Sequence, residues 1–176
     1  YGFYASDITR TWPTNGRFSK AQRELYDIVL AAQLECIGKA AVGVAYDVIH
    51  QAAVQVITDG LLSLGLLKGS LKKNIESAAY KKFYMHKTGH WIGLDVHDVG
   101  EYKLGGSSRL LEPGMVFTVE PGLYIAPGTP GVPDKYQGIG IRIEDDVLMT
   151  AKGPEVISDG VPKTVDAIES LMASAR

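Results

Sequence analysis

The sequence is poor in cysteine and contains no long hydrophobic run. Cys36 is the one cysteine among 176 residues, so no disulfide can form within the chain. A lone thiol is typical of a reducing compartment and predicts a cytoplasmic location; on a helix it is usually a small buried apolar side chain. No stretch approaches the roughly 20 apolar residues of a membrane-spanning helix, so we expect no membrane association.

An excess of charge of one sign is also absent. The chain has 18 Lys and Arg against 20 Asp and Glu, a formal net charge of −2, with no basic run. This balance gives no reason to expect nucleic acid as a partner. Residues 1–4 lack both the basic start of a signal peptide and an initiator methionine, and they open inside an apparent strand. We therefore expect a fragment of a larger domain.

The first half of the chain has helical periodicity. Ser19 and Gln22 match a capping box, and the apolar residues behind them recur at helical spacing, which predicts a helix over 19–40. A second apolar set predicts a helix over 46–64. Residues 70–80 are expected to form a short helix or a loop.

The second half is rich in glycine and β-branched residues, which are typical of strands and turns. The expected elements are an extended segment at 1–14, strands at 115–120, 122–126 and 139–150, a surface loop at 128–138 and a closing helix at 165–175. Two helices followed by an antiparallel sheet predict a single α+β layered domain.

Three of the four histidines, His86, His90 and His97, lie within twelve positions. The first two are four residues apart, as in the H-E-x-x-H motif of zinc proteases. That motif is excluded because Lys87 stands where the catalytic glutamate would be, and because two nearby glycines disfavour a helix. On an extended segment, one histidine can bind a metal while another donates a hydrogen bond nearby.

Three carboxylates stand in or beside apolar strand-like segments: Asp7, Glu120 and Glu144. Combined with a histidine, they make an oxygen-rich site that suits Mn²⁺, Co²⁺ or Zn²⁺, and two metals if a carboxylate bridges. Strand alternation places Arg142 on the face of Glu144, where it can offset negative charge or bind a substrate carbonyl. The simpler interpretation of each acid is a turn residue or a solvated strand face.

In order along the chain, several segments resemble the pita-bread metallopeptidases, in the branch of Xaa-Pro aminopeptidase (aminopeptidase P) and prolidase. These segments are 7–13, 22–27, 90–100, 111–115, 119–125 and 138–146. The Gly-Ile-Gly-Ile-Arg-Ile-Glu-Asp-Asp run favours aminopeptidase P over prolidase. The resemblance implies a curved antiparallel sheet backed by helices, with residues 1–176 as the C-terminal portion of one catalytic domain whose N-terminal part is missing.

The resemblance also implies a dinuclear metal centre, usually of manganese. Asp7 and Glu144 would bridge both metals, and His90 and Glu120 would complete the shell of the second. A water activated by the metals would attack the Xaa-Pro carbonyl, with Glu120 handling its proton.

The same resemblance implies a binding site for a peptide with proline at its second position. His86 would shape the proline pocket, and His97 would donate a hydrogen bond to the substrate carbonyl or its tetrahedral intermediate. Tyr124 and Arg142 would orient Glu144 and the substrate.

The chain departs from the family pattern in two places. The family's first metal ligand, an Asp in an Asp-x-Gly strand, would fall before Tyr1. We therefore expect the chain alone to bind at most one metal tightly, to be nearly inactive, and to form homo-oligomers or require a companion segment. The second departure is Lys87-Thr88, where many relatives have Gly and a small or apolar residue; it affects the substrate pocket more than the metals.

Three alternatives remain open at the level of sequence. Prolidase would differ in preferring dipeptides to longer peptides, and a creatinase-like amidinohydrolase would act on creatine. The third is a catalytically incomplete pita-bread scaffold used for binding, because fold alone does not define function.

Overall fold

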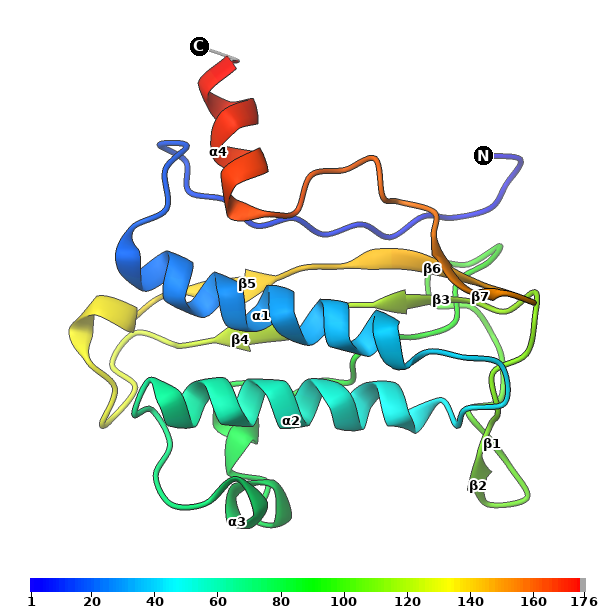
Figure 1. Ribbon diagram of the computed structural model, residues 1–176, viewed down its shortest axis with the longest axis horizontal. Coiled ribbons are helices and arrows are strands. Elements are labelled where there is room, and N and C mark those ends of the chain that lie inside the picture. Colours follow the sequence, from blue (N-terminus) through cyan, green and yellow to red (C-terminus); the bar gives the residue numbers. More distant parts are fainter. Residues whose placement is uncertain (175–176) are drawn as a thin grey trace.

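A layer of two antiparallel helices dominates the computed structural model, which describes residues 1–174 (Figure 1). The helices are α1 (Lys20–Lys39) and α2 (Asp47–Ser63). Both predicted helices are confirmed, and so is the capping box: the Ser19 hydroxyl accepts from the Gln22 amide, while the Gln22 side chain accepts from the Ser19 amide.

The remaining helices are short. They are α3 (Leu71–Glu76), the 3₁₀ helices η1 (Ala79–Lys82) and η2 (Asp134–Tyr136), and α4 (Val165–Ser174). The segment expected to be a short helix or a loop at 70–80 is thus helical in part. The closing helix is confirmed up to Ser174; the last residue predicted for it lies outside the described residues.

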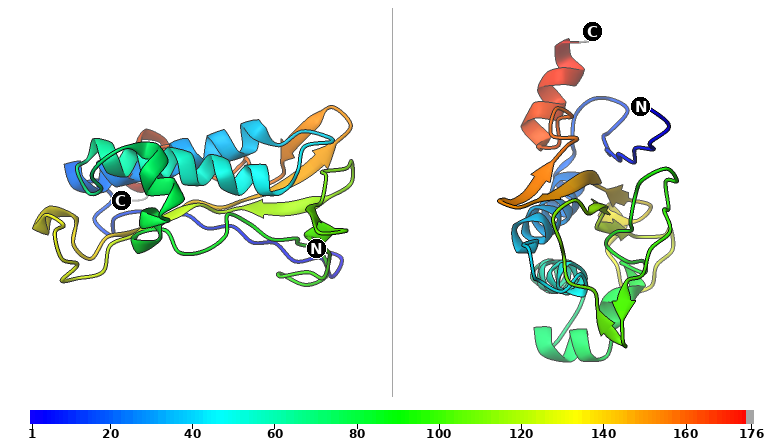
Figure 2. Two further views of the ribbon diagram at one scale, coloured as in Figure 1. Left: turned by 90° about the horizontal axis from the view of Figure 1, so that it is seen from below. Right: turned by 90° about the vertical axis from the view of Figure 1, so that its right-hand side faces the viewer.

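The strands lie against one side of the α1–α2 layer (Figure 2). They form three small antiparallel sheets with the orders β3-β6-β7, β4-β5 and β1-β2. Their bounds are β1 (Lys103–Leu104), β2 (Ser107–Ser108), β3 (Val116–Val119), β4 (Gly122–Tyr124), β5 (Gly140–Arg142), β6 (Asp145–Thr150) and β7 (Gly153–Val156). The predicted α+β architecture, antiparallel strands backed by helices, is confirmed.

The strand predicted over 139–150 is wrong in its continuity. It divides into β5 and β6, which belong to different sheets. Between them, Glu144 forms an isolated antiparallel bridge with Thr9, whose carbonyl accepts from the Glu144 amide at 3.0 Å. Glu144 therefore pairs with the N-terminal segment rather than with a neighbouring strand. This bridge is the one β-type pairing of residues 1–14, which otherwise form no strand. The hairpin β1-β2 and strand β7 were not predicted.

The core lies between the helices and the strands. Fully buried side chains from both layers meet there, among them Leu25, Val29, Ile57, Leu61, Phe117, Ile143 and Val147. Each contributes about 1.5–3 kcal/mol relative to an exposed position. Cys36 on α1 is also fully buried, as expected for a small apolar side chain.

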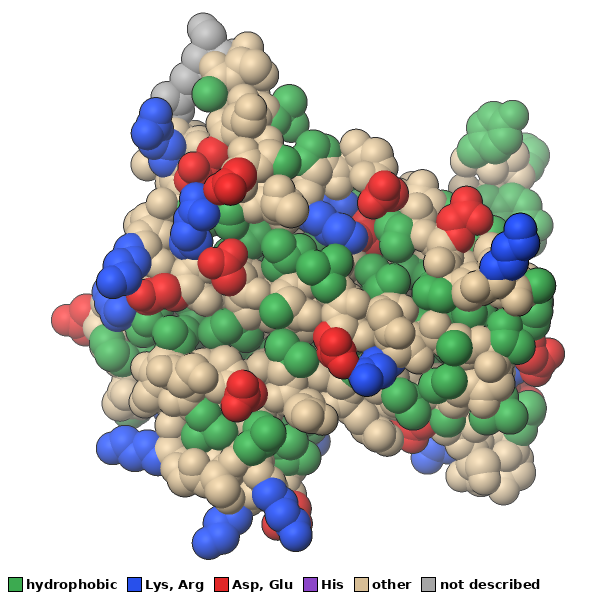
Figure 3. Space-filling model, in the orientation of Figure 1, with side chains coloured by type: hydrophobic (Ala, Val, Ile, Leu, Met, Phe, Trp, Pro, Cys, Tyr) green, Lys and Arg blue, Asp and Glu red, His purple; other side chains and the backbone are tan. Residues whose placement is uncertain are grey.

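The helical face of the molecule is mixed in character and shows no histidine side chain among the described residues (Figure 3). A hydrophobic group projects at the N-terminal end, where Tyr1, Phe3 and Tyr4 are exposed. None of the described helices is long and apolar enough to cross a membrane. The chemistry-bearing residues therefore lie away from the helical face.

Candidate metal centre

The register of the strands brings together residues that are distant in sequence. Strand β3 pairs with β6, and β4 pairs with β5. The link between β3 and β4 carries Glu120, and the link between β5 and β6 carries Glu144, so the two carboxylates meet where the sheets adjoin. The Thr9 bridge brings Asp7 to the same place. These residues line a cavity of about 350 Å³ together with His86, Lys87, Gly89, His90, His97 and Arg142.

The segment that carries His90 is held by strand-like hydrogen bonds. The Thr118 amide donates to the His90 carbonyl at 2.9 Å, and the Glu120 amide donates to the Thr88 carbonyl at 2.7 Å. Gly89 makes this approach possible, because a Cβ there would collide with the Thr118 carbonyl oxygen. The backbone thereby sets His90 and Glu120 side by side.

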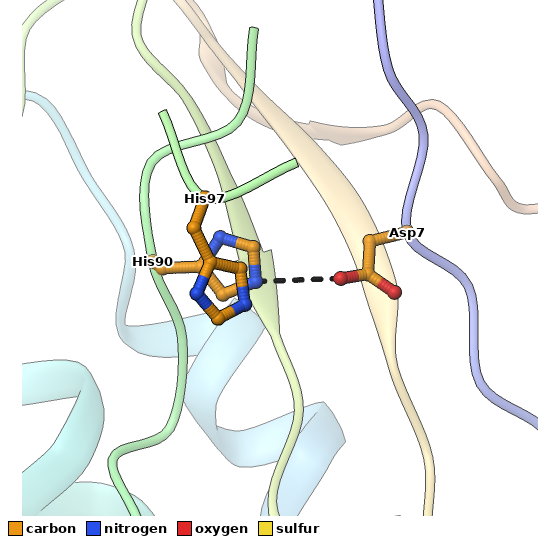
Figure 4. Close-up of side chains that lie close together, drawn as sticks. All are labelled: Asp7, His90 and His97. Atoms are coloured by element: carbon orange, nitrogen blue, oxygen red, sulfur yellow. Dashed lines mark ion pairs between the residues drawn. The ribbon is translucent and has the colours of Figure 1, made fainter. Parts of the chain in front are cut away.

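The imidazole of His90 turns its Nε2 toward the carboxylates. Its Nδ1 lies 2.9 Å from the Trp91 carbonyl, which can only accept, so Nδ1 carries the proton. Its buried Nε2 has no hydrogen-bond partner among the described residues. This nitrogen lies 3.4 Å from Asp7 Oδ2 and 3.7 Å from Glu120 Oε1 (Figure 4). An imidazole nitrogen beside two carboxylates, with its other nitrogen held by a backbone carbonyl, is a donor set that fits a divalent metal.

Two overlapping groups of side chains have metal-binding geometry. Asp7, His90 and His97 place their ligand atoms within 4.8 Å of one another, and so do His90, Glu120 and Glu144. His90 belongs to both groups. The rings of His90 and His97 lie 4.0 Å apart and overlap in Figure 4, with Asp7 reaching them from the N-terminal segment. His97 is thus close enough to act as a ligand or as a hydrogen-bond donor beside one.

Glu144 is nearly inaccessible, with 2% of its surface exposed. Burial, together with the negative charges of Glu120 and Asp7, raises the pKa of its carboxyl to about 7, although the hydrogen bond from the Thr9 hydroxyl lowers it. That hydroxyl donates to Glu144 Oε2 at 2.5 Å. Full ionisation of this carboxylate cluster therefore requires a compensating positive charge.

The side chains expected to contact substrate form a second layer around the carboxylates. His86 Nδ1 lies 2.7 Å from the Lys87 carbonyl and must donate to it, so His86 Nε2 accepts from the Tyr124 hydroxyl at 2.8 Å. Arg142 Nη1 lies 3.7 Å from Glu120 Oε2. His86, Tyr124 and Arg142 also line an adjoining cavity of about 410 Å³.

Sequence reasoning missed two residues that hold the predicted ligands. The Glu144 carboxylate accepts a side-chain hydrogen bond from Thr9, a residue to which the sequence patterns gave no role of its own. The buried Asp146 accepts from the Asp7 amide at 3.2 Å through Oδ2, and its Oδ1 has no partner among the described residues. A signal for Thr9 was available, because it shares a face with Asp7 in an extended segment.

Comparison with known proteins agrees with this arrangement. The model of metallopeptidase family M24 matches residues 1–151. The Xaa-Pro aminopeptidase of Haemophilus influenzae is 49% identical over 172 residues, and that of Escherichia coli is 49% identical over 176 residues. These alignments cover 98% and 100% of this chain, respectively. The chain spans only 40% of the length of each relative.

Solved structures of high similarity confirm the pita-bread fold. Aminopeptidase PepP of Pseudomonas aeruginosa matches with a TM-score of 0.98 and 56% sequence identity. The match covers 99% of this chain and 40% of the PepP chain. Zinc-substituted aminopeptidase P of E. coli, in complex with product, has a TM-score of 0.95 and 49% identity, over 100% of this chain and 40% of its own. With a family model that matches most of its length and these relatives, the chain belongs to metallopeptidase family M24.

Proposed function

We propose that the chain supplies most of the active site of an Xaa-Pro aminopeptidase, which hydrolyses the bond between an N-terminal residue and a following proline. The observation that carries the proposal is the free Nε2 of His90, aimed at carboxylates from two other segments. The naming of the 49% identical relatives as Xaa-Pro aminopeptidases supports it. On this proposal, residues 1–176 are the C-terminal portion of one catalytic domain, and the buried lone Cys36 suits the cytoplasm.

Two divalent metals fit the donor set, with Mn²⁺ first and Co²⁺ or Zn²⁺ as substitutes. Asp7 and Glu144 would hold both metals, and His90 and Glu120 would complete the shell of one. The metals would supply Lewis acidity and lower the pKa of a water for attack on the peptide carbonyl. Thr9, through its hydroxyl, would fix the orientation of Glu144, and Asp146, through the Asp7 amide, would fix that of Asp7.

The proton of the attacking water would pass to Glu120. Its carboxylate is well placed because one oxygen faces His90 and the other faces Arg142 at 3.7 Å. The positive charge of Arg142 offsets part of the negative charge that the carboxylates gather around the cavity. Glu120 then delivers the proton to the leaving proline nitrogen, as general acid.

Two histidines would bind the substrate from the cavity wall. The ring of the exposed His97 lies 4.0 Å from that of His90 and can donate to the carbonyl oxygen as it becomes negative in the transition state. His86 is locked by its two hydrogen bonds, to the Lys87 carbonyl and from Tyr124. The rings of His86 and Tyr124, 5.4 Å apart, form a fixed wall against which a proline ring can pack.

The proposal is tested with the natural full-length protein loaded with Mn²⁺. We expect cleavage of Ala-Pro-Ala after the first residue, and a fall in kcat on the order of 10²–10⁴-fold in Glu120→Gln. Glu155→Gln, on the exposed part of β7, is the matched control and should retain full activity. Cleavage of Ala-Pro but not of Ala-Pro-Ala would favour prolidase, and hydrolysis of creatine would favour an amidinohydrolase. A metal-loaded protein inactive on all three would contradict the proposal.

A further inference from the structure

The fourth histidine, His50, lies outside the metal centre on α2 and takes part in a buried hydrogen-bond chain. Its Nδ1 is 2.8 Å from the Thr88 hydroxyl, which is 2.6 Å from the Tyr84 hydroxyl. Thr88 and Tyr84 have only 2% and 1% of their surface exposed. Buried hydroxyl groups are costly unless hydrogen-bonded, so this chain constrains the three side chains strongly.

The direction of the chain follows from counting donors. Burial raises the pKa of Tyr84, so its phenol keeps its proton. Burial, together with the positive charge of Lys87, lowers the pKa of His50 to about 4, so its ring is neutral at pH 7. If Tyr84 donates to Thr88 and Thr88 donates to His50 Nδ1, every hydroxyl proton has an acceptor. The reverse direction leaves the Tyr84 proton without a recorded acceptor among the described residues.

Thr88 connects this chain to the metal centre through the backbone. It lies between His86 and His90, and its carbonyl accepts from the Glu120 amide at 2.7 Å. On the side of α2, a third cavity of about 370 Å³ is lined by His50 and Thr88, among other residues. Lys87 and Gly89 line both this cavity and the carboxylate-lined one. Segment 87–89 is thus the wall between the two cavities, and without a tether on the α2 side it could move into the empty space.

We propose that His50 is a positioning residue of the peptidase site, which holds Thr88 through its Nδ1 and thereby keeps His86, His90 and Glu120 in register. The inference rests on the proposed peptidase function. The Thr88 hydroxyl and the unprotonated Nδ1 of His50 lie 2.8 Å apart, so the two side chains form a donor–acceptor pair.

The kinetic test uses two single variants and their combination in the full-length, metal-loaded protein. His50→Phe removes the acceptor, and Thr88→Val removes the donor at nearly constant volume. We expect each to lower kcat for Ala-Pro-Ala about tenfold with KM changed less than about twofold, because the bond orients groups used in the chemical step. The double variant should lose no more than either single one, because both remove the same bond.

Two further variants separate positioning from a general effect on folding. His50→Asn places a side-chain oxygen near the position of Nδ1 and should restore kcat to within about threefold of the wild type. Gln51→Ala, exposed on the same helix, should match the wild type. Melting temperatures check that all variants are folded. Full activity in His50→Phe, or multiplicative losses in the double variant, would overturn the proposal.

An independent readout is the tautomer of His50 in zinc-loaded protein labelled with ¹⁵N-histidine, since Mn²⁺ is paramagnetic. Nitrogen shifts should show a neutral ring with its proton on Nε2, and Thr88→Val should shift the Nδ1 resonance. A proton on Nδ1 of His50 would overturn the proposed direction of the hydrogen-bond chain. A wild type that does not cleave Ala-Pro-Ala would instead refute the proposed function, and the tautomer would still decide whether the hydrogen-bond chain exists.

Discussion

Two consecutive buried carboxylates, Glu144 and Asp145, have opposite environments. They are 2% and 0% exposed, and as neighbours in an extended segment they point to opposite sides of the chain. Glu144 receives one recorded side-chain hydrogen bond, from Thr9, and faces other acids. Asp145 accepts at 2.6–2.7 Å from four side chains, namely Arg10, Gln33, Ser158 and Lys163.

The two environments move the pKa values in opposite directions. Burial alone would raise the pKa of Asp145, but hydrogen bonds from Lys163, Arg10 and Ser158 outweigh it and lower the pKa. The pKa of Glu144 rises to about 7 because burial and the negative charges of Glu120 and Asp7 outweigh the lowering effects of Thr9 and Arg142. Asp145 therefore joins distant segments of the fold through its hydrogen bonds. The negative charge of Glu144 is unfavourable in its cavity unless a metal neutralises it.

The largest predicted effect is the loss of the Asp145 charge. Asp145→Asn leaves Arg10 and Lys163, whose side chains are only 6% and 14% exposed, without their carboxylate. We expect the free energy of unfolding to fall by about 3–5 kcal/mol, as for other broken buried ion pairs. Urea unfolding measures it, with the exposed Asp159→Asn as the matched control. A loss below about 1 kcal/mol would show that Asp145 is not the structural member of the pair.

For Glu144→Gln in the metal-free protein, we expect the free energy of unfolding to rise rather than fall. The folded pKa of about 7 exceeds the ordinary value of 4.5, so the stability that the protonated carboxyl contributes is lost as pH rises through about 7. The substituted amide does not ionise, and at pH 8 the variant should be more stable than the wild type by about 1–3 kcal/mol.

This gain should shrink to nothing near pH 4, where the wild-type carboxyl is protonated in both states. Urea unfolding in EDTA at both pH values measures it, and repeating the pH 8 measurement with Mn²⁺ should favour the wild type. Equal stability of variant and wild type at pH 8 would remove the contrast between the two carboxylates.

Cys36 is a third buried group, and unlike the two carboxylates it lies in the hydrophobic core. Its thiol is fully buried, lies 3.1 Å from the Ile49 carbonyl, and has its pKa raised by burial to about 12. We expect modification by a thiol reagent at pH 8 to be on the order of 10²–10³-fold slower in the native protein than in urea. Native and unfolded rates that agree would show that the α1–α2 layer opens readily.

Local patterns predicted the elements whose stability depends on neighbouring residues. The capping box of Ser19 and Gln22 placed the start of α1 because its two hydrogen bonds span three residues. Alternation placed Arg142 on the face of Glu144, and both side chains line the same cavity, because side chains in an extended segment point to opposite faces in turn. The continuous strand over 139–150 failed because a segment far away in the chain pairs with Glu144.

The sequence alone predicted which acids and histidines are candidate metal ligands, because the chemistry of a ligand is a property of its side chain. Their partners were not, because each contact joins residues far apart in sequence. Thr9 and Glu144 are separated by 135 positions, Arg10 and Asp145 by 135, and His50 and Thr88 by 38. Such pairs form only when strand register and helix packing close the loops between them, and those follow from the burial of the whole core.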